Sequence, residues 1–292
     1  MELLKQNKEK MKILFELEDR IRPDSTCVYF CKAFQKLADV TIARPEQLPY
    51  IDPKYFDLYV RVDYGIDYPA YGKVDPWRPE FENSVYYVID THIDDEWRLK
   101  MAKEKRFKHV FCAQMPALKA DWHTKNVYWL PLACDPDYHK PKQKYDKIHD
   151  ICFIGSVQPH WQSRRIERLD KLFKSVPNFW TGNKFFEEAT IKYAQSKIVF
   201  NSAHSNDINM RVFEAMCSGT CLLTDKQDWQ GLFEDDRYFF DYKSDEEMVD
   251  KANRLLKNEK FRNEMEIKAQ NLVLSKHTYL HRCKEILKTI GM

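Results

Sequence analysis

The stretch NDINMRVFEAMCSGTCLLTD, residues 206–225, places Arg211 and Glu214 three residues apart where a polar loop turns into a helix. This loop follows the apolar run KIVFNSA (197–203), and the helix leads into a second apolar run, CLLTD (221–225). A strand, a helix and a second strand in this order predict part of a parallel sheet with helical crossovers. Ligands in such sheets bind where strands end and helices begin, so the stretch also predicts a site.

The same alternation runs through the rest of the chain. Short runs rich in apolar, β-branched or aromatic residues predict further strands at residues 11–18, 39–43, 56–63, 84–90, 109–114, 127–133, 150–156, 178–182 and 237–242. Helices are expected at residues 25–37, 164–174, 187–196 and 244–257, and two more carry the chain to its end. Residues 134–150 are rich in proline and lysine, which predicts a linker. We therefore expect an α/β protein with two doubly wound domains.

Composition narrows the possible classes of protein. A length of 292 residues suits two domains, and 47 basic against 45 acidic residues give a net charge of +2. This balance predicts no general attraction to nucleic acid or to anionic membranes. No apolar segment approaches the ~20 residues that span a bilayer, and the N-terminal stretch does not resemble a secretory signal. The eight cysteines include no CxxC pair, which fits reduced, buried thiols in a cytoplasmic protein.

Gly155 and Ser156 mark a first candidate phosphate site. They follow the apolar run CFI directly, and a glycine at the end of a strand lets the backbone approach a ligand closely. The helix beyond them offers Arg164 and Arg165, whose guanidinium groups match phosphate oxygens.

The second candidate site is the stretch around Arg211. Its guanidinium and the free amides of the helix start would hold a diphosphate, while the carboxylate of Glu214 would accept hydrogen bonds from ribose hydroxyls. Together these groups describe a nucleotide site. The alternative is that Arg211 and Glu214 form an ion pair on the helix surface and that Gly219 only ends the helix.

Residues 198–225 resemble the donor-site segment of group 1 glycosyltransferases of the GT-B fold, most closely the spore-maturation (CgeB-like) branch. That branch repeats a pattern N-x-R-x-F-E-A-M-x-x-G-T, which is matched here by Asn209, Arg211, Phe213, Glu214, Ala215, Met216, Gly219 and Thr220. The likeness extends to DICFIGS, WLPLACDPDYHKP, YYVIDTH and HTYLHRCKEIL. It covers the second half of the chain well and the first half in patches.

The resemblance implies two Rossmann-like domains that face each other across a cleft. Residues 11–135 would bind the acceptor after a polar extension, residues 1–10, and a C-terminal helix at 277–292 would return to this domain. Residues 136–276 would hold a nucleoside diphosphate sugar such as a UDP-sugar, without a metal or other cofactor. The implied activity is transfer of the sugar to a hydroxyl-bearing acceptor. The residues expected to bind the donor are Gly155, Ser156, Arg165, Asn206, Asn209, Arg211 and Glu214.

Asn206 departs from the pattern of the larger members of this superfamily, which carry a glutamate at that position. An amide can still bind a hydroxyl or a phosphate, but it supplies no negative charge to an oxocarbenium-like transition state. The resemblance therefore does not fix whether the sugar is transferred with retention or inversion. It also leaves open a non-catalytic sensor that binds a nucleotide sugar without transferring it.

A catalytic base, if the enzyme inverts, is expected from the first domain. Asp90 and His92 follow the apolar run of YYVIDTH, and a histidine has a suitable pKa for taking a hydroxyl proton near neutrality. The alternative is that Asp90 caps the next helix and His92 packs or contacts the backbone. Asp63 and Asp67 are candidates for acceptor contact, although a glycine-containing turn also explains them.

Two other classes of site are discounted. The triplet Asp135-Pro136-Asp137 has the form of a metal-binding Asp-x-Asp motif, but it opens the predicted linker and the GT-B fold uses no such metal. No G-x-G-x-x-G follows the first strand, which argues against a dinucleotide-dependent dehydrogenase. The acceptor stays open among a glycan, a protein, a small molecule and a modified DNA base.

Overall fold

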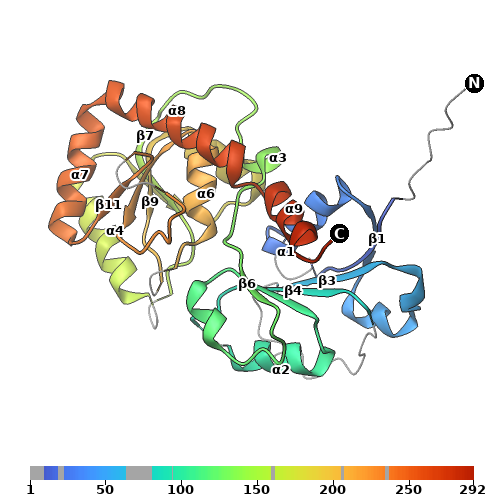
Figure 1. Ribbon diagram of the computed structural model, residues 1–292. Coiled ribbons are helices and arrows are strands. Elements are labelled where there is room, and N and C mark those ends of the chain that lie inside the picture. The colour runs from blue at the N-terminus through green and yellow to red at the C-terminus, as the bar shows by residue number, and fades with distance from the viewer. Residues whose placement is uncertain are drawn as a thin grey trace, which may run out of the picture. The chain divides into compact units, whose positions relative to one another are not determined.

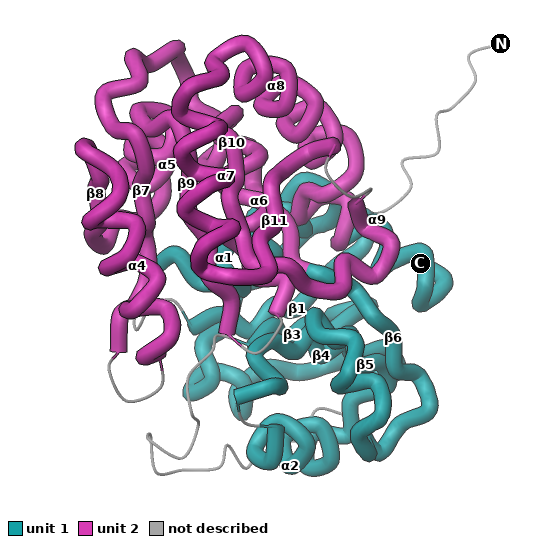
Figure 2. The backbone as a smooth tube through the Cα atoms, turned by 90° about the vertical axis from the view of Figure 1, so that its left-hand side faces the viewer, with its two compact units in different colours: residues 1–131, 283–292 teal, residues 132–282 magenta. Residues whose placement is uncertain are grey.

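Two compact units make up the chain, and each is built on a parallel sheet (Figures 1 and 2). The first unit comprises residues 1–131 and 283–292, and the second comprises residues 132–282. The computed structural model describes residues 10–18, 23–63, 81–93, 95–158, 162–204, 207–233 and 237–292. The predicted class, two α/β domains with parallel sheets, is confirmed.

The first unit contains a six-stranded sheet in the order β2-β1-β3-β4-β5-β6. Its strands are β1 (Lys12–Glu16), β2 (Asp39–Ala43), β3 (Leu58–Val62), β4 (Ser84–Val88), β5 (His109–Cys112) and β6 (Val127–Trp129). Its helices are α1 (Thr26–Gln35), α2 (Glu96–Lys105), the short 3-10 helices η1 (Pro45–Tyr50), η2 (Pro53–Tyr55) and η4 (Met115–Lys119), and the end of α9 (Tyr279–Thr289).

Helices cover both faces of this first sheet. In Figure 1, α1 and α9 lie on one side of the sheet and α2 lies on the other. Phe30 of α1 packs on Tyr87 of β4 with ring centroids 4.5 Å apart. Met101 of α2 belongs to the same core cluster as Tyr86, the preceding residue of the strand. Every residue of β3 and β4 is buried, as expected for central strands of a parallel sheet.

The second unit contains a five-stranded parallel sheet in the order β11-β10-β9-β7-β8. Its strands are β7 (His149–Ile154), β8 (Phe179–Gly182), β9 (Ser196–Asn201), β10 (Cys221–Asp225) and β11 (Phe240–Tyr242). Its helices are α3 (Pro136–His139), α4 (Ser163–Ser175), α5 (Phe186–Ala194), α6 (Met210–Cys217), α7 (Asp245–Lys257) and α8 (Glu259–Lys276). Within the part of the chain that the structure describes, none of these or the other helices is long and apolar enough to cross a bilayer.

Two α-helices of the described chain, α2 and α3, lie where the sequence pattern predicts no helix. Helix α2 was not predicted because its buried side includes Arg98 and Lys105, so the helix shows no simple apolar stripe. The predicted linker at residues 134–150 begins with the short helix α3, and the two units divide just before it, between Pro131 and Leu132. Hydrophobic periodicity finds neither feature.

A buried group of charges lies inside the first unit. Glu16 of β1 and Arg61 of β3 are partners in the sheet register, are both fully buried and form an ion pair. Tyr59 donates its hydroxyl hydrogen to Glu16, and Lys105 Nζ lies 3.9 Å from Glu16 Oε2. One carboxylate therefore serves two buried cations.

Because Glu16 serves both cations, we expect Glu16→Gln to destabilise the protein more than Arg61→Met. The first change leaves two buried positive charges without this carboxylate, whereas the second leaves Glu16 with Lys105. Breaking a buried ion pair from one side costs about 3–5 kcal/mol, and urea unfolding measures both losses. A larger loss for Arg61→Met would contradict this arrangement.

Candidate functional site

The predicted donor residues that the structure describes gather at the carboxyl edge of the second sheet. Strands β7 and β9 are parallel neighbours, so the loops that follow them meet at the same edge. Gly155 follows β7, Asn201 ends β9, and α6 starts at Met210 with Asn209 at its N-cap position. The free amides at the start of α6 therefore belong to this edge of the sheet.

Arg211 lies in the first turn of α6 and is held by two neighbours. Its Nη1 donates a 2.7 Å hydrogen bond to Asn201 Oδ1, and its guanidinium carbon lies 4.7 Å from the centroid of the Phe153 ring. Its Nε is buried without a hydrogen-bond partner, and Arg211 forms no ion pair with any described residue. A positioned cation with an unused donor is the arrangement that an anionic ligand completes.

Gly155 was predicted to let the backbone approach a ligand closely. In the structure its missing side chain leaves room for a neighbouring side chain instead. A Cβ atom on Gly155 would overlap Nη2 of Arg211, so any other residue at this position would displace the guanidinium. Gly155 therefore makes room for Arg211, and the two predicted sites are one.

Arg165 of α4 joins the same group of residues. Its Nε and Nη2 donate to the carbonyl oxygen of Ser202 at 3.0 and 2.8 Å, and its Nη1 donates to that of Ser156 at 3.0 Å. These bonds tie the loop after β7 to the loop after β9. Burial, and then the neighbouring charge of Arg211, lower the pKa of Arg165 to about 10, so the Arg165 guanidinium is still cationic at neutral pH.

Asn209 adds a second buried polar atom without a partner. Its Nδ2 donates to Asn201 Oδ1 at 3.1 Å, while its own Oδ1 is buried and accepts no hydrogen bond. The side chain makes no capping bond to α6. The unsatisfied buried atoms of Asn209 and Arg211, which both donate to Asn201, make the start of α6 a candidate ligand site.

Glu214, one turn along α6, points to other partners than Arg211. The Tyr193 hydroxyl lies 3.4 Å from Glu214 Oε2, and His139 Nε2 lies 3.6 Å from Glu214 Oε1. The His139 ring is oriented by its Nδ1, which accepts a 2.9 Å hydrogen bond from the backbone N–H of Asp135. The surface ion pair that the sequence left open is therefore not what the structure contains.

The Asp-x-Asp triplet has a structural role. Asp135 occupies the N-cap position of α3, and its Oδ1 accepts a 3.0 Å hydrogen bond from the backbone N–H of Asp137. This arrangement caps a helix and turns His139 toward Glu214.

The candidates from the first half of the chain lie in the first unit. Asp90 and His92 are half-buried after β4, with a carboxylate oxygen and a ring nitrogen within 4.8 Å of each other, and Asp90 has a left-handed φ of 55°. Helix α2 starts at Glu96 with Asp95 at its N-cap position, so Asp90 does not cap it. Asp63 is fully buried and forms an ion pair with Arg98.

Two predicted residues lie outside the described part of the chain: Asp67 and Asn206. Three side chains of the site were not predicted, namely Asn201, His139 and Tyr193. Asn201 ends the apolar run that the sequence marks as a strand, and a polar residue there is the signal that could have identified it. His139 and Tyr193 carry no local signal, because only the fold brings them to Glu214.

Comparison with known proteins gives one family match. Residues 152–288 match the sequence model of a family described as glycosyl transferase-like. No curated protein matches the chain.

Several solved structures are similar in fold. T4 phage β-glucosyltransferase in complex with UDP and Mn²⁺ has a TM-score of 0.64 and 15% identity, covering 97% of this chain and 100% of that one. A glycosyltransferase from Rickettsia africae has a TM-score of 0.65 and 10% identity, covering 96% and 97%. TarM from S. aureus has a TM-score of 0.58 and 13% identity. The match covers 80% of this chain and 55% of the TarM chain. The chain thus shares the fold of these glycosyltransferases, and its residues 152–288 match the glycosyl transferase-like family.

Proposed function

We propose that this protein transfers a sugar from a nucleoside diphosphate sugar to a hydroxyl-bearing acceptor. The observation that carries the proposal is the guanidinium of Arg211, fixed by Asn201 and Phe153 with Nε unpaired at the start of α6. The family match over residues 152–288 supports it. A UDP-sugar is the proposed donor, because the phage β-glucosyltransferase of the same fold is described with uridine diphosphoglucose as its substrate.

The chemical step breaks the bond between the sugar's anomeric carbon and the diphosphate, and negative charge grows on the departing diphosphate. Arg211 and the amides at the start of α6 stabilise that charge, and Arg165 adds positive potential from the neighbouring helix. Because these groups are already in place, little reorganisation is needed as the charge develops. Asn209 and Asn206 are proposed as further polar contacts to the donor, and Ser156 as a backbone contact.

Glu214 is the proposed contact to the ribose. A carboxylate accepts two hydrogen bonds from vicinal hydroxyls, and Tyr193 and His139 hold it in one orientation. The acceptor hydroxyl attacks the anomeric carbon and loses its proton to a base, for which we propose His92 assisted by Asp90. Asp63 and Asp67 remain proposed acceptor contacts.

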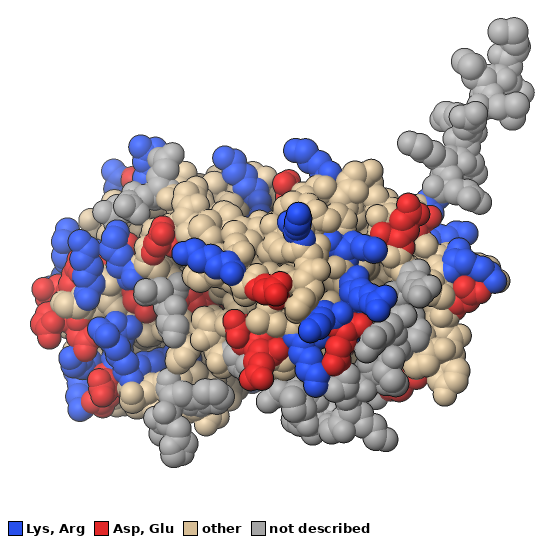
Figure 3. All heavy atoms as spheres, turned by 60° about the horizontal axis from the view of Figure 1, so that its bottom comes forward, with Lys and Arg blue, Asp and Glu red and all other residues tan. Residues whose placement is uncertain are grey.

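The acceptor is proposed to be a glycan, a protein or a small molecule rather than DNA. Lysine and arginine side chains are interspersed with aspartate and glutamate on the face shown in Figure 3, and the net charge is +2. One similar protein is described as a DNA modifying enzyme, so a modified DNA base is kept as the alternative acceptor.

The finer placement of the protein is also a proposal. The pattern from Asn209 to Thr220 supports the spore-maturation branch. All eight cysteines are buried and free, which supports a reducing, cytoplasmic setting. We propose catalysis without a metal, because two guanidinium groups and helix amides already supply positive potential to the diphosphate.

Exchange of Arg211 for lysine tests the proposed function. Lysine keeps the positive charge, but it lacks the planar guanidinium that can donate to Asn201 and to the ligand at the same time. Hydrogen bonds to charged groups contribute about 1.5–3 kcal/mol, so we expect UDP to bind Arg211→Lys at least about 10-fold more weakly by calorimetry. Slow release of UDP from UDP-glucose should fall in parallel.

The matched control is Arg254→Lys, an exposed arginine on α7, which should bind UDP as the unaltered protein does. Unchanged UDP binding by Arg211→Lys would refute the proposed diphosphate site. Tight binding of UDP-sugars without turnover on any acceptor would instead favour the non-catalytic sensor.

Gly155→Ala is expected to act through Arg211. The added methyl group displaces the guanidinium, so UDP affinity should fall about 10-fold, as for loss of one charge-assisted hydrogen bond. In the Arg211→Met background the same substitution should have little further effect, because the two residues act as one unit. Additive losses in this double-mutant cycle would show that Gly155 acts independently of Arg211.

Glu214 should matter only for nucleotides that carry ribose hydroxyls. We expect the unaltered protein to bind UDP more tightly than its 2′,3′-dideoxy analogue, and Glu214→Ala to bind both equally, because the hydroxyl contacts are gone. His139→Ala should reduce the preference only in part, since Tyr193 still holds the carboxylate. If Glu214→Ala kept the full preference for UDP over its 2′,3′-dideoxy analogue, the ribose would have to bind at another position.

A further inference from the structure

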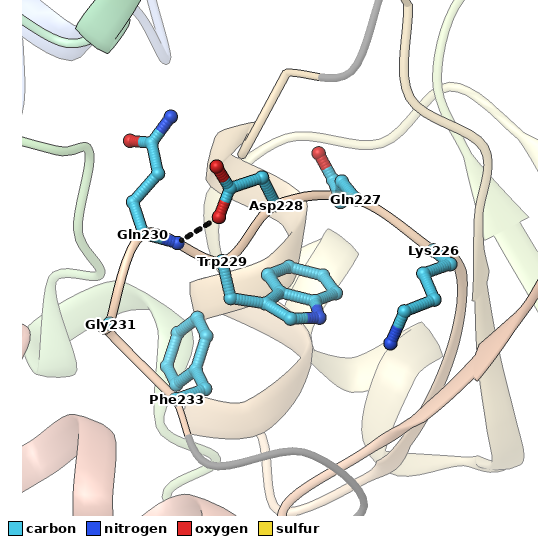
Figure 4. Close-up of a pocket in the computed structure, with 7 residues that line it drawn as sticks. All are labelled: Lys226, Gln227, Asp228, Trp229, Gln230, Gly231 and Phe233. Atoms are coloured by element: carbon cyan, nitrogen blue, oxygen red, sulfur yellow. Dashed lines mark hydrogen bonds between the residues drawn. The ribbon is translucent and has the colours of Figure 1, made fainter.

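A pocket of about 410 Å³ lies in the loop that follows β10 (Figure 4). Its lining residues are Lys226, Gln227, Asp228, Trp229, Gln230, Gly231 and Phe233. Strand β10 is the parallel neighbour of β9, whose last residue, Asn201, holds Arg211. The loop therefore leaves the sheet at the same edge as the diphosphate site and one strand away, about 5 Å.

Gln227 is the unusual residue of this pocket. Its side chain is 7% exposed, and both its Oε1 and its Nε2 are buried without a hydrogen-bond partner. A buried carboxamide with neither group paired carries the full cost of its desolvation. Such a group in a native structure calls for a missing partner, and here it lines a pocket that can supply one once the amide rotates toward it.

The charges around the pocket are already paired. Lys226 Nζ lies 3.1 Å from Asp241 Oδ2, and Asp228 Oδ1 accepts a 2.9 Å hydrogen bond from the backbone N–H of Gln230. An anionic ligand would gain little from these groups, in contrast to the unpaired guanidinium of Arg211. The lining therefore suits a neutral ligand with several hydrogen-bonding groups.

The aromatic residues of the pocket favour a sugar over a nucleobase. The rings of Trp229 and Phe233 pack on each other with centroids 5.7 Å apart, and both also contact Phe239. With Trp229 4% exposed and Phe233 7% exposed, neither ring offers an open face on which a base could stack.

Helix α6 separates this pocket from the residues that hold Glu214. Phe213 of α6 packs on Phe233 of the pocket with ring centroids 5.8 Å apart, while Glu214, the next residue, contacts Tyr193 and His139. Successive residues of a helix differ by about 100° in direction, so the two contacts lie on different sides of α6. Arg211 lies in the first turn of α6.

We propose that this pocket binds the sugar of the donor and that the carboxamide of Gln227 forms hydrogen bonds to its hydroxyls. The inference rests on the proposed function. It divides the donor among three parts of the second unit. The ribose goes to Glu214, the diphosphate to Arg211, and the sugar to the loop after β10.

Calorimetry of Gln227→Met with UDP, UDP-glucose and UDP-N-acetylglucosamine, without acceptor, tests the assignment. Loss of the carboxamide should lower the affinity for the UDP-sugar that the unaltered protein prefers by about 3- to 10-fold. The affinity for UDP should stay unchanged. The free protein should melt at the same or a higher temperature, because the substitution removes buried groups that have no partner. Gln35→Met, at an exposed position on α1, is the matched control and should change neither affinity.

Three results would overturn the assignment. The first is that Gln227→Met lowers the affinities for UDP and UDP-sugar equally, and the second is that it changes neither affinity. The third is a clear loss of stability in the free variant, which would show that Gln227 has a structural role. If UDP binding still depends on Arg211 in any of these cases, the proposed function stands and only the sugar pocket falls. If the unaltered protein binds neither UDP nor a UDP-sugar, both fall together.

Discussion

One guanidinium group, fixed between a carboxamide and an aromatic ring, organises the carboxyl edge of the second sheet. Arg211 of α6 contacts Phe153 of β7 and Asn201 of β9. Asn201 in turn donates from Nδ2 to Thr224 Oγ1 of β10 at 3.0 Å. These contacts link the ends of three neighbouring strands, and Gly155 leaves the space that the guanidinium needs. The position of the cation is therefore set before a ligand arrives, which is the condition for electrostatic stabilisation without reorganisation.

Unpaired charge distinguishes this edge from Arg168, a buried arginine of the same unit. Arg168 lies one turn beyond Arg165 on α4, but its guanidinium is neutralised by Asp225 and Asp245, each at 3.3 Å. Among the described residues, Arg165 donates only to backbone carbonyls, and its burial, followed by the nearby charge of Arg211, lowers its pKa to about 10. The fold thus keeps two cations close together without a described carboxylate partner. An anionic ligand relieves their repulsion, whereas it would compete with the existing partners of Arg168.

The sequence predicts the framework of the site better than its details. Apolar runs mark the strands, and Gly155 and Arg211 follow two of them, so the edge at which they meet could be predicted from periodicity and topology alone. Phe153 was predicted only as a strand residue, because its ring contact with Arg211 exists only after β7 and α6 come together. His139 and Lys105 were missed for the same reason. A polar residue whose partner lies far along the chain leaves no local pattern.

Two arginines, one in each unit, differ in their partners. In the first unit Arg61 faces its register partner Glu16, and the pair is enclosed in the core, where it serves packing. In the second unit Arg211 reaches the sheet edge with Nε unpaired, while the nearby pocket encloses an unpaired neutral amide, Gln227. Desolvation makes each unpaired group costly, and a ligand of matching chemistry would offset that cost. An anionic group beside a neutral, hydroxyl-rich one matches both positions, and a nucleotide sugar contains the two in that order.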